Sequence, residues 1–180
     1  MPAVRTAPKL DQFALHRTEY SATPAPRFVR LPRAKYLSIE GAGRPGSPGF
    51  QERLQALYSV AFTLKFQQKA KGRDFRMLML EGLYDLNPAA TSGSSSTPIS
   101  WTLLLRMPGF VRASDVARAV RQLREKGKPA LVSEVRLSRL EEGRSVQLMH
   151  VGPYSAEDQS IMALQEFARS NHVEVLGRHH

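Results

Sequence analysis

One pattern of strand, glycine, turn and helix occurs twice in this chain, and it limits the folds that the chain can adopt. Near the front, an alternating segment reaches Gly41 and a helical segment begins at Phe50. Near the back, a similar segment reaches Gly152 and a helical one begins at Ile161, so the same spacing separates glycine and helix in both copies. A repeated strand–helix unit indicates two halves related by a pseudo-two-fold axis. The seam between such halves is a natural place for a ligand cleft.

The composition narrows the classes of function. A chain of 180 residues suffices for one ordinary domain with a core and a pocket. The absence of cysteine excludes disulfides, thiolate metal sites and a cysteine nucleophile, and it fits a reducing compartment. No apolar run approaches the roughly 20 residues of a membrane span, and residues 1–8 lack the apolar stretch of a secretory signal. We therefore expect a cytoplasmic protein.

The net charge of +10 raises the question of a nucleic-acid partner. The excess lies in two stretches, because residues 1–36 and residues 112–139 each carry five more basic than acidic side chains. These basic residues are interleaved with strand and helix positions and not with aromatic residues, which favours solvated faces over a nucleic-acid patch. A nucleic-acid binder stays open as a third possibility, but we expect no specific nucleic-acid partner and no membrane partner.

Apolar periodicity predicts the order of elements along the chain. Alternation predicts strands at residues 28–39, 75–84, 99–107, 131–140, 145–151 and 173–176. Three-to-four spacing predicts helices at residues 50–70, 114–126 and 156–170. The order is β-α-β-β, a connecting helix, then β-β-α-β. It indicates an α+β fold of duplicated β-α-β-β units, with antiparallel sheet, helices on one face and a central ligand cleft.

Several boundaries follow from turn residues. Residues 1–27 contain scattered prolines and are expected to be a lead-in segment, with one domain over residues 28–180. The Ser/Gly/Pro-rich residues 86–98 predict a flexible loop. Pro32 interrupts the first strand, which places part of it at an edge or bulge. The strands on either side of residues 141–144 are expected to form a hairpin.

Glu81 is the sharpest candidate for chemistry. Period-two counting places it on the face of Phe75, Met77 and Met79. A carboxylate on an apolar face is costly unless it is paired, and it can serve as a general acid or base or anchor a cationic ligand. The alternative is a strand end at which Gly82 bends the chain and Glu81 reaches solvent or an arginine.

An aromatic set lies on elements that should meet. It can form a cage that holds a flat or cationic ligand by stacking and cation–π contact. For each member, ordinary core packing is the alternative. The set consists of Tyr58, Phe62, Tyr84, Trp101 and Tyr154.

Neither a metal nor a cofactor is expected. The five histidines show no His-x-x-x-His spacing, and the common nucleotide-binding and serine-hydrolase motifs are absent from the sequence. His150, before Gly152, is of a kind that more often has its hydrogen bonds satisfied in the core or at an edge than acts as a catalyst.

Five segments in order resemble the GyrI-like small-molecule-binding domain family, over residues 9–180. They are Lys35–Gly41, Ala56–Lys65, Leu80–Leu83, Trp101–Arg106 and His150–Tyr154. The resemblance implies a duplicated β-α-β-β fold with a central ligand cleft lined at the positions of Tyr58, Glu81, Trp101 and Tyr154.

The resemblance also implies two kinds of function. Related domains are the effector-binding parts of multidrug-sensing regulators, and a stand-alone branch is similar to hydrolases that open cyclopropane rings in DNA-alkylating natural products. We therefore expect a protein that binds flat apolar or cationic compounds and hydrolyses strained toxins, with Glu81 as the catalytic carboxylate. The alternative is a non-catalytic effector-binding or toxin-sequestering module. The stand-alone branch continues into a further acidic strand after the segment like residues 177–180, so we expect a truncated last strand and weak turnover.

Overall fold

The computed structural model describes residues 8–85, 99–153 and 156–180. The chain divides into two compact units. Unit 1 comprises Met1–Gln12, Ala34–Leu140 and Arg178–His180, and unit 2 comprises Phe13–Arg33 and Glu141–Gly177. The predicted loop at residues 86–98 and the candidate Tyr154 lie outside the described residues. Within the described ranges, no helix combines the length and the apolarity needed to cross a bilayer.

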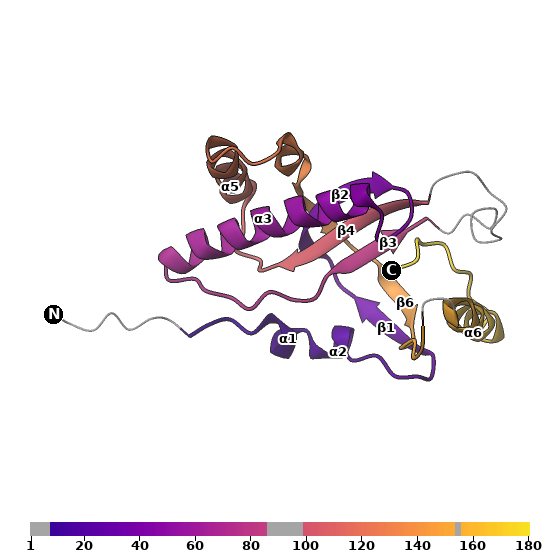
Figure 1. Cartoon of the computed structure of the whole chain (residues 1–180). Coiled ribbons are helices and arrows are strands. Elements are labelled where there is room, and N and C mark those ends of the chain that lie inside the picture. The colour runs from indigo at the N-terminus through magenta and orange to yellow at the C-terminus, as the bar shows by residue number, and fades with distance from the viewer. Residues whose placement is uncertain (1–7, 86–98, 154–155) are drawn as a thin grey trace. The chain divides into compact units, whose positions relative to one another are not determined.

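Unit 1 is built on an antiparallel sheet in the order β3-β4-β2-β5. Its strands are β2 (Ala34–Ala42), β3 (Glu81–Tyr84), β4 (Ser100–Met107) and β5 (Arg136–Leu140). Its helical elements are α3 (Pro48–Ala70), α5 (Ala113–Glu125) and the 3-10 helix η1 (Ala130–Glu134). Figure 1 shows α3 lying along the sheet, with α5 beside it.

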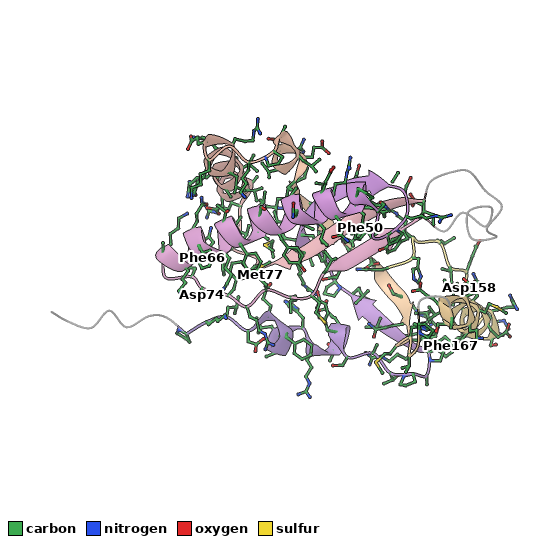
Figure 2. The ribbon with its side chains drawn as sticks, viewed as in Figure 1. Phe50, Phe66, Asp74, Met77, Asp158 and Phe167 are labelled. Atoms are coloured by element: carbon green, nitrogen blue, oxygen red, sulfur yellow. The ribbon has the colours of Figure 1, made fainter. Side chains whose placement is uncertain are left out.

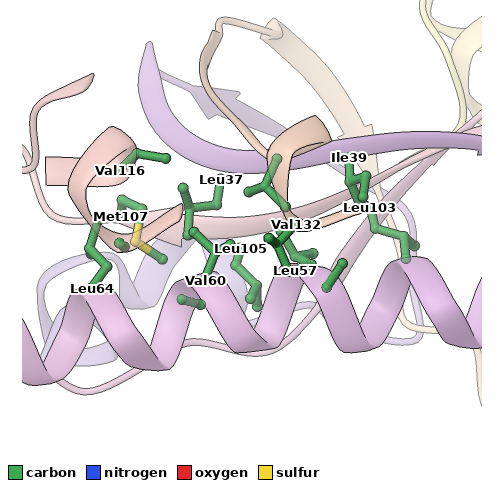
Figure 3. Close-up of a cluster of buried hydrophobic side chains, with 14 of the residues drawn as sticks. Leu37, Ile39, Leu57, Val60, Leu64, Leu103, Leu105, Met107, Val116 and Val132 are labelled. Carbon is green, nitrogen blue, oxygen red and sulfur yellow. The ribbon is translucent and has the colours of Figure 1, made fainter. Parts of the chain in front are cut away.

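The main core of unit 1 lies between α3 and one face of this sheet. Helix α3 contributes Leu57, Val60 and Leu64, each with no exposed surface, because residues three and four apart share a helix face. Alternate residues of the strands meet them, since side chains in a strand point to opposite faces. The strand contribution includes Leu37, Ile39, Leu103, Leu105 and Met107 (Figure 3).

Trp101 is part of this core. Its indole Nε1 donates a hydrogen bond to the Gly43 carbonyl at 3.0 Å, and its ring meets the Phe50 ring edge-on at 4.9 Å. Trp101 lies opposite Gly41 in the β2–β4 register, and a Cβ built at Gly41 would lie 2.2 Å from the Trp101 ring. Gly41 therefore does not end the strand, as the repeated pattern suggested, but leaves room for the indole inside it.

Unit 2 contains a two-stranded antiparallel sheet of β1 (Arg27–Leu31) and β6 (Gly143–Gln147). Its helices are α2 (Arg17–Tyr20) and α6 (Glu157–Ser170), and most of α1 (Gln12–Leu15) also belongs to it. The Phe28 ring packs against Phe167 of α6 at 5.1 Å, and the Arg144 guanidinium lies 4.0 Å from the centre of the same ring. Figure 2 labels Phe167 on α6.

The predicted α+β class with antiparallel sheets is confirmed, and the three long helices lie within two residues of their expected bounds. The first strand differs, because it splits into β1 and β2, which belong to different sheets. The break falls at Pro32, whose backbone nitrogen has no hydrogen to donate to a neighbouring strand. The prediction of a single strand over residues 28–39 was therefore wrong, but the expected interruption at Pro32 is present and β1 is an edge strand.

The expected hairpin around residues 141–144 is also wrong. Strand β5 pairs with β2, whereas β6 pairs with β1. Residues 130–134, expected to begin a strand, form η1 directly after Pro129. Residues 173–176 form no strand, and the C-terminal segment instead makes one antiparallel bridge, between Tyr84 and His179.

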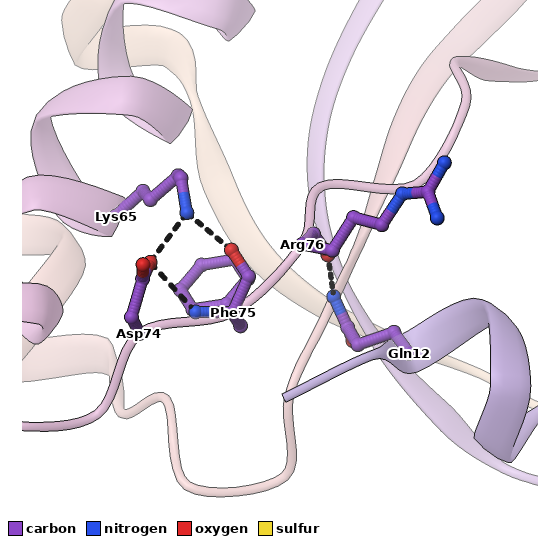
Figure 4. A network of polar contacts seen from close by, with 5 residues as sticks. All are labelled: Gln12, Lys65, Asp74, Phe75 and Arg76. Atoms are coloured by element: carbon purple, nitrogen blue, oxygen red, sulfur yellow. Dashed lines mark hydrogen bonds and ion pairs between the residues drawn. The ribbon is translucent and has the colours of Figure 1, made fainter. Parts of the chain in front are cut away.

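The strand expected at residues 75–84 is shorter because its first part bonds elsewhere. The Arg76 N–H donates to the Leu10 carbonyl, and the Leu10 N–H donates to the Asp74 carbonyl. Gln12, only 1% exposed, donates from Nε2 to the Arg76 carbonyl at 3.0 Å (Figure 4). Residues 10–12 of the lead-in segment are thus held beside residues 74–76.

Lys65 of α3 holds the same turn from the other side. Its ammonium donates to the Asp74 carboxylate at 2.5 Å and to the Phe75 carbonyl. The hydrogen bond from Lys65 lowers the pKa of Asp74 below its ordinary value of 3.8, against a smaller opposing effect of burial. Asp74 therefore stabilises the fold in its charged form.

We expect Gly41→Ala to destabilise the protein by about 1–3 kcal/mol, because the added methyl group overlaps the Trp101 ring and the core must shift. Gly109→Ala is the matched control, since a Cβ at Gly109 meets nothing within 4 Å. Chemical unfolding of both variants measures the difference. Equal stability of the two variants would contradict the close packing of Trp101 on Gly41.

Asp74→Asn should lower the melting temperature at pH 7, and this difference should shrink as the pH falls below 3.8. The folded-state pKa of Asp74 is depressed, so its stabilisation is present above about 3.8 and is lost as the pH falls through the folded value. Thermal unfolding from pH 7 to pH 2.5 measures the convergence of the two curves. Asp11→Asn, in an exposed pair with Arg76 at 3.6 Å, serves as the control and should change little at either pH.

Candidate functional site

A shallow depression lies on α3, beside the stripe that packs on the sheet. The helix starts firmly, because the Ser47 hydroxyl accepts a hydrogen bond from the Phe50 N–H and Pro48 occupies the first turn. Over 23 residues, its apolar side chains cover more of its circumference than the core uses. The depression has a volume of about 350 Å³ and is lined by Gln51, Leu54, Gln55, Tyr58, Ser59 and Phe62. We call it the aromatic depression.

Two of its residues are members of the predicted aromatic set. The Tyr58 and Phe62 rings stack at a centroid distance of 6.0 Å and an interplanar angle of 24°. Tyr58 is half-buried and packs partly against the core, whereas Phe62 is 44% exposed. One ring is thus held by the core while the other presents a face to solvent.

The remaining lining is uncharged and consists of the apolar Leu54 and three polar residues. Gln51, Gln55 and Ser59 supply amide and hydroxyl groups that both donate and accept hydrogen bonds. A flat ligand can stack on the aromatic pair while its polar edge bonds to these groups. Since the lining contains no carboxylate, a cationic ligand would be held there through the ring faces alone.

Tyr58 and Phe62 were predicted from the sequence, whereas their polar neighbours Gln51, Gln55 and Ser59 were not. The signal for them is spacing, because residues 51, 55 and 59 and residues 54, 58 and 62 form two adjacent rows of the helix, four residues apart. Phe66, 60% exposed, continues the second row by one more turn but does not line the depression (Figure 2).

Trp101 and Tyr84 have other surroundings. Trp101 is 1% exposed and offers no open ring face, which agrees with the core alternative. Tyr84 lies directly opposite Trp101 in the β3–β4 register and is half-buried against the same core. Its ring lies over Gly82, where a Cβ would be 2.8 Å from the nearest ring carbon.

Glu81 lies on the other face of the sheet. It pairs in register with Leu104, which packs with Tyr36 and Leu83 in a second apolar cluster on the face away from α3. The alternation of side chains between the two faces of the sheet does not extend back from β3 to residues 75–79. Phe75 and Met77 pack in the core on the α3 side, and Met79 is 62% exposed. The expectation that Glu81 shares their face was therefore wrong, although its apolar setting was right.

The Glu81 carboxylate has a histidine partner. Its side chain is 12% exposed, and its Oε2 lies 3.1 Å from His180 Nε2. Thr102 and Arg106 of β4 lie on the same face of the sheet, opposite Leu83 and Tyr36 respectively, and both are buried. This face of the sheet therefore holds the Glu81 carboxylate beside an imidazole that can exchange protons with it.

The residues that complete this face come from the end of the chain. Arg178 donates to the Thr102 hydroxyl at 3.1 Å and to the Leu83 carbonyl at 3.2 Å, and it pairs with Asp85 at 2.6 Å. His179 exchanges backbone hydrogen bonds of 2.7 and 3.0 Å with Tyr84. The sequence analysis gave these residues no role, because pairing across about 95 residues leaves no local pattern.

His150 agrees with its predicted structural role. Its Nδ1 lies 2.8 Å from the Ser160 hydroxyl, and its Nε2 lies 3.1 Å from the Pro153 carbonyl. Since a carbonyl only accepts, Nε2 donates to Pro153, while Nδ1 is hydrogen-bonded to the Ser160 hydroxyl. Both nitrogens are thus satisfied inside unit 2.

The structure therefore separates the predicted site residues. Tyr58 and Phe62 share the aromatic depression, while Trp101 and Tyr84 belong to the core. Glu81 lies on the opposite face of the sheet from α3.

Comparisons with known proteins find solved structures of similar fold, two of which are hydrolases. No protein-family model and no curated protein matches the chain. The structure is similar to that of a hydrolase from Listeria innocua, at 29% identity and a TM-score of 0.78, covering 91% of this chain and 82% of that one. It is also similar to a hydrolase encoded by lin2189 from Listeria innocua, at 28% identity and a TM-score of 0.82, covering 92% and 82%. An uncharacterized conserved protein from Listeria innocua is similar at 28% identity and a TM-score of 0.83, covering 95% and 88%.

Proposed function

We propose that this protein binds flat apolar small molecules, with or without a positive charge, in the aromatic depression on α3. The stacked pair of Tyr58 and Phe62 is the observation that carries the proposal, because an exposed ring supported by a half-buried neighbouring ring is a ready stacking surface. Burial of such a ring on one side fixes its orientation, so little side-chain freedom is lost when a ligand stacks on it. The uncharged polar lining then selects ligands by the groups on their edges.

A second proposal concerns hydrolysis, and it is favoured by the hydrolases among the similar structures. We propose that Glu81 acts as a general base toward a strained electrophile such as a cyclopropane joined to a conjugated ketone. Its support is a carboxylate 12% exposed in an apolar setting, with an imidazole at 3.1 Å. A carboxylate with a proton-exchanging partner beside it can take a proton from a bound water molecule.

The proposed reaction adds water across one bond of the cyclopropane ring. The Glu81 carboxylate takes a proton from water as the water oxygen forms a bond to the ring methylene carbon. The ring carbon–carbon bond breaks, and its electron pair moves into the conjugated ketone to give an enolate. Protonated His180 or solvent donates a proton to the enolate. Glu81 then gives the proton that it took from water to His180 or to solvent. The ring-opened alcohol is the product.

Binding is tested with two flat fluorescent probes, the cation acridine orange and the neutral hydrocarbon pyrene. Phe62→Ala should weaken the binding of both by about 1–2 kcal/mol, roughly 5- to 30-fold, because the stacking surface is lost. Phe66→Ala is the matched control, since Phe66 is one turn away and more exposed but does not line the depression. An equal loss in both variants would show that the probes adhere to exposed aromatic rings in general.

Hydrolysis is tested with a synthetic cyclopropane fused to a conjugated dienone, followed by the loss of its ultraviolet absorption. Glu81→Gln keeps the shape of the side chain but removes the base, so turnover should fall by at least 100-fold. Glu40→Gln is the control, because Glu40 lies on the same face of the sheet, opposite Thr102, and is exposed. Full turnover by Glu81→Gln would remove Glu81 from the reaction. Probe binding without any turnover by the unaltered protein would leave a sequestering function.

A further inference from the structure

Basic side chains from two distant parts of the sequence lie together in unit 1. Helices α3 and α5 pack side by side, and Gln67 Nε2 donates to Gln122 Oε1 at 2.8 Å between them. At the C-terminal end of α3, the Lys71 ammonium lies 3.0 Å from the Asp115 carboxylate of α5. Lys71 is thereby placed beside the arginines of α5, although more than 40 residues separate them in sequence.

The arginines of α5 do not alternate with apolar residues in space. Val116, Ala119 and Leu123 are buried in the core, so one side of the helix is fully used for packing. The exposed arginines recur every three residues on another side, as helix geometry requires. Together with Lys71 we call them the basic stripe, which consists of Lys71, Arg118, Arg121 and Arg124.

Two acidic residues of α5, the buried Asp115 and the exposed Glu125, offset part of this charge. Asp115 is 5% exposed and is approached by both Lys71, at 3.0 Å, and Arg118, at 3.7 Å. Hydrogen bonds from Lys71 and the Arg112 N–H lower the pKa of Asp115 although its burial, the largest single effect, opposes them. The buried Asp115 carboxylate thus pairs with two of the four cations, and Arg124 also donates to the Lys128 carbonyl at 2.5 Å. All three arginines remain exposed.

We propose that the basic stripe binds the phosphate backbone of duplex nucleic acid without regard to sequence. Arg118 and Arg124 are six residues apart, which is about 9 Å along the helix axis. A duplex strand carries a phosphate about every 3.4 Å of its axis, so the stripe spans between two and three phosphates. Guanidinium groups suit this partner because their planar forks bond phosphate oxygens in pairs.

The composition of this surface favours nucleic acid over an anionic membrane. A helix that lies on a membrane inserts exposed apolar side chains, and its charges only assist. Among the described residues, the large exposed apolar side chains include Leu15, Phe62, Phe66 and Met79, but none from α5. The stripe is a purely electrostatic surface, so it matches a partner of high and regular charge density.

The test measures the binding of a fluorescein-labelled 20-base-pair duplex of random sequence by anisotropy, between 50 and 200 mM NaCl. Contact with three phosphates should lower the affinity about 40-fold over this range. The variant Arg118→Gln/Arg121→Gln/Arg124→Gln should lose at least tenfold in affinity at 50 mM NaCl. Its plot of log affinity against log salt concentration should have a slope shallower by two to three. These side chains are exposed, and circular dichroism and thermal unfolding will check that the variant folds.

A charge-matched variant separates a local surface from the net charge of the protein. Arg17→Gln/Arg30→Gln/Arg33→Gln removes the same charge from exposed positions of unit 2 and should bind within twofold of the unaltered protein. Equal losses in both triple variants would overturn the proposal, as would no measurable binding at 50 mM NaCl. Tighter binding to phosphatidylserine vesicles or to polyglutamate than to the duplex, lost in the α5 variant, would also overturn it.

Discussion

The seating of Trp101 on Gly41 is the contact on which the rest of unit 1 depends. A strand residue without a side chain leaves a gap, and the indole from β4 fills that gap across the register pair. The same ring donates to the Gly43 carbonyl and meets Phe50, the first buried residue of α3. One side chain thus fixes the pairing of β2 with β4, the turn after β2 and the start of the helix. Because the ring needs a glycine opposite it, a register shift by one residue would lose all three contacts and expose the core face.

The sheet then divides the chemistry of unit 1 between its two faces. On the α3 side, Trp101 and Tyr84 pack in the core, whereas Tyr58 and Phe62 lie at its edge, where a ligand can stack on them. On the other side, an apolar cluster surrounds Glu81 and His180. In the two proposals, binding uses side chains of α3 on one side of the sheet, whereas proton transfer uses Glu81 of β3 on the other side. Substitutions at one face are therefore expected to leave the other intact, which makes the two proposals separable.

Local patterns predicted the long elements well. The helix of residues 48–70 and the strand of residues 100–107 have strong periodicity, and both lie close to where the sequence places them. Such patterns could not predict which strands pair, because β5 and β6 have the pattern of a hairpin but pair with strands about 100 to 120 residues earlier. The face of Glu81 was missed for a related reason, since the hydrogen bonds of Arg76 to Leu10 draw residues 75–80 out of the sheet and break the alternation. Of the predicted ligand-binding residues, those on α3 line a depression because a helix fixes their spacing, whereas strand residues depend on which partner the strand finds.

The pairing of β1 with β6 has a consequence for the newly made chain. Arg27 and Gln147 are register partners 120 residues apart, so at about 5–20 residues per second β1 leaves the ribosome some 6–24 seconds before its partner exists. During that interval its backbone groups are open to pairing with other chains. Arg27, Arg30 and Arg33 lie within or next to this strand, and Pro32 follows it. Charged side chains and a missing backbone N–H donor are features by which natural edge strands resist aggregation. The arginines and Pro32 therefore protect β1 until β6 is made, and Pro32 is also the residue at which the first strand breaks.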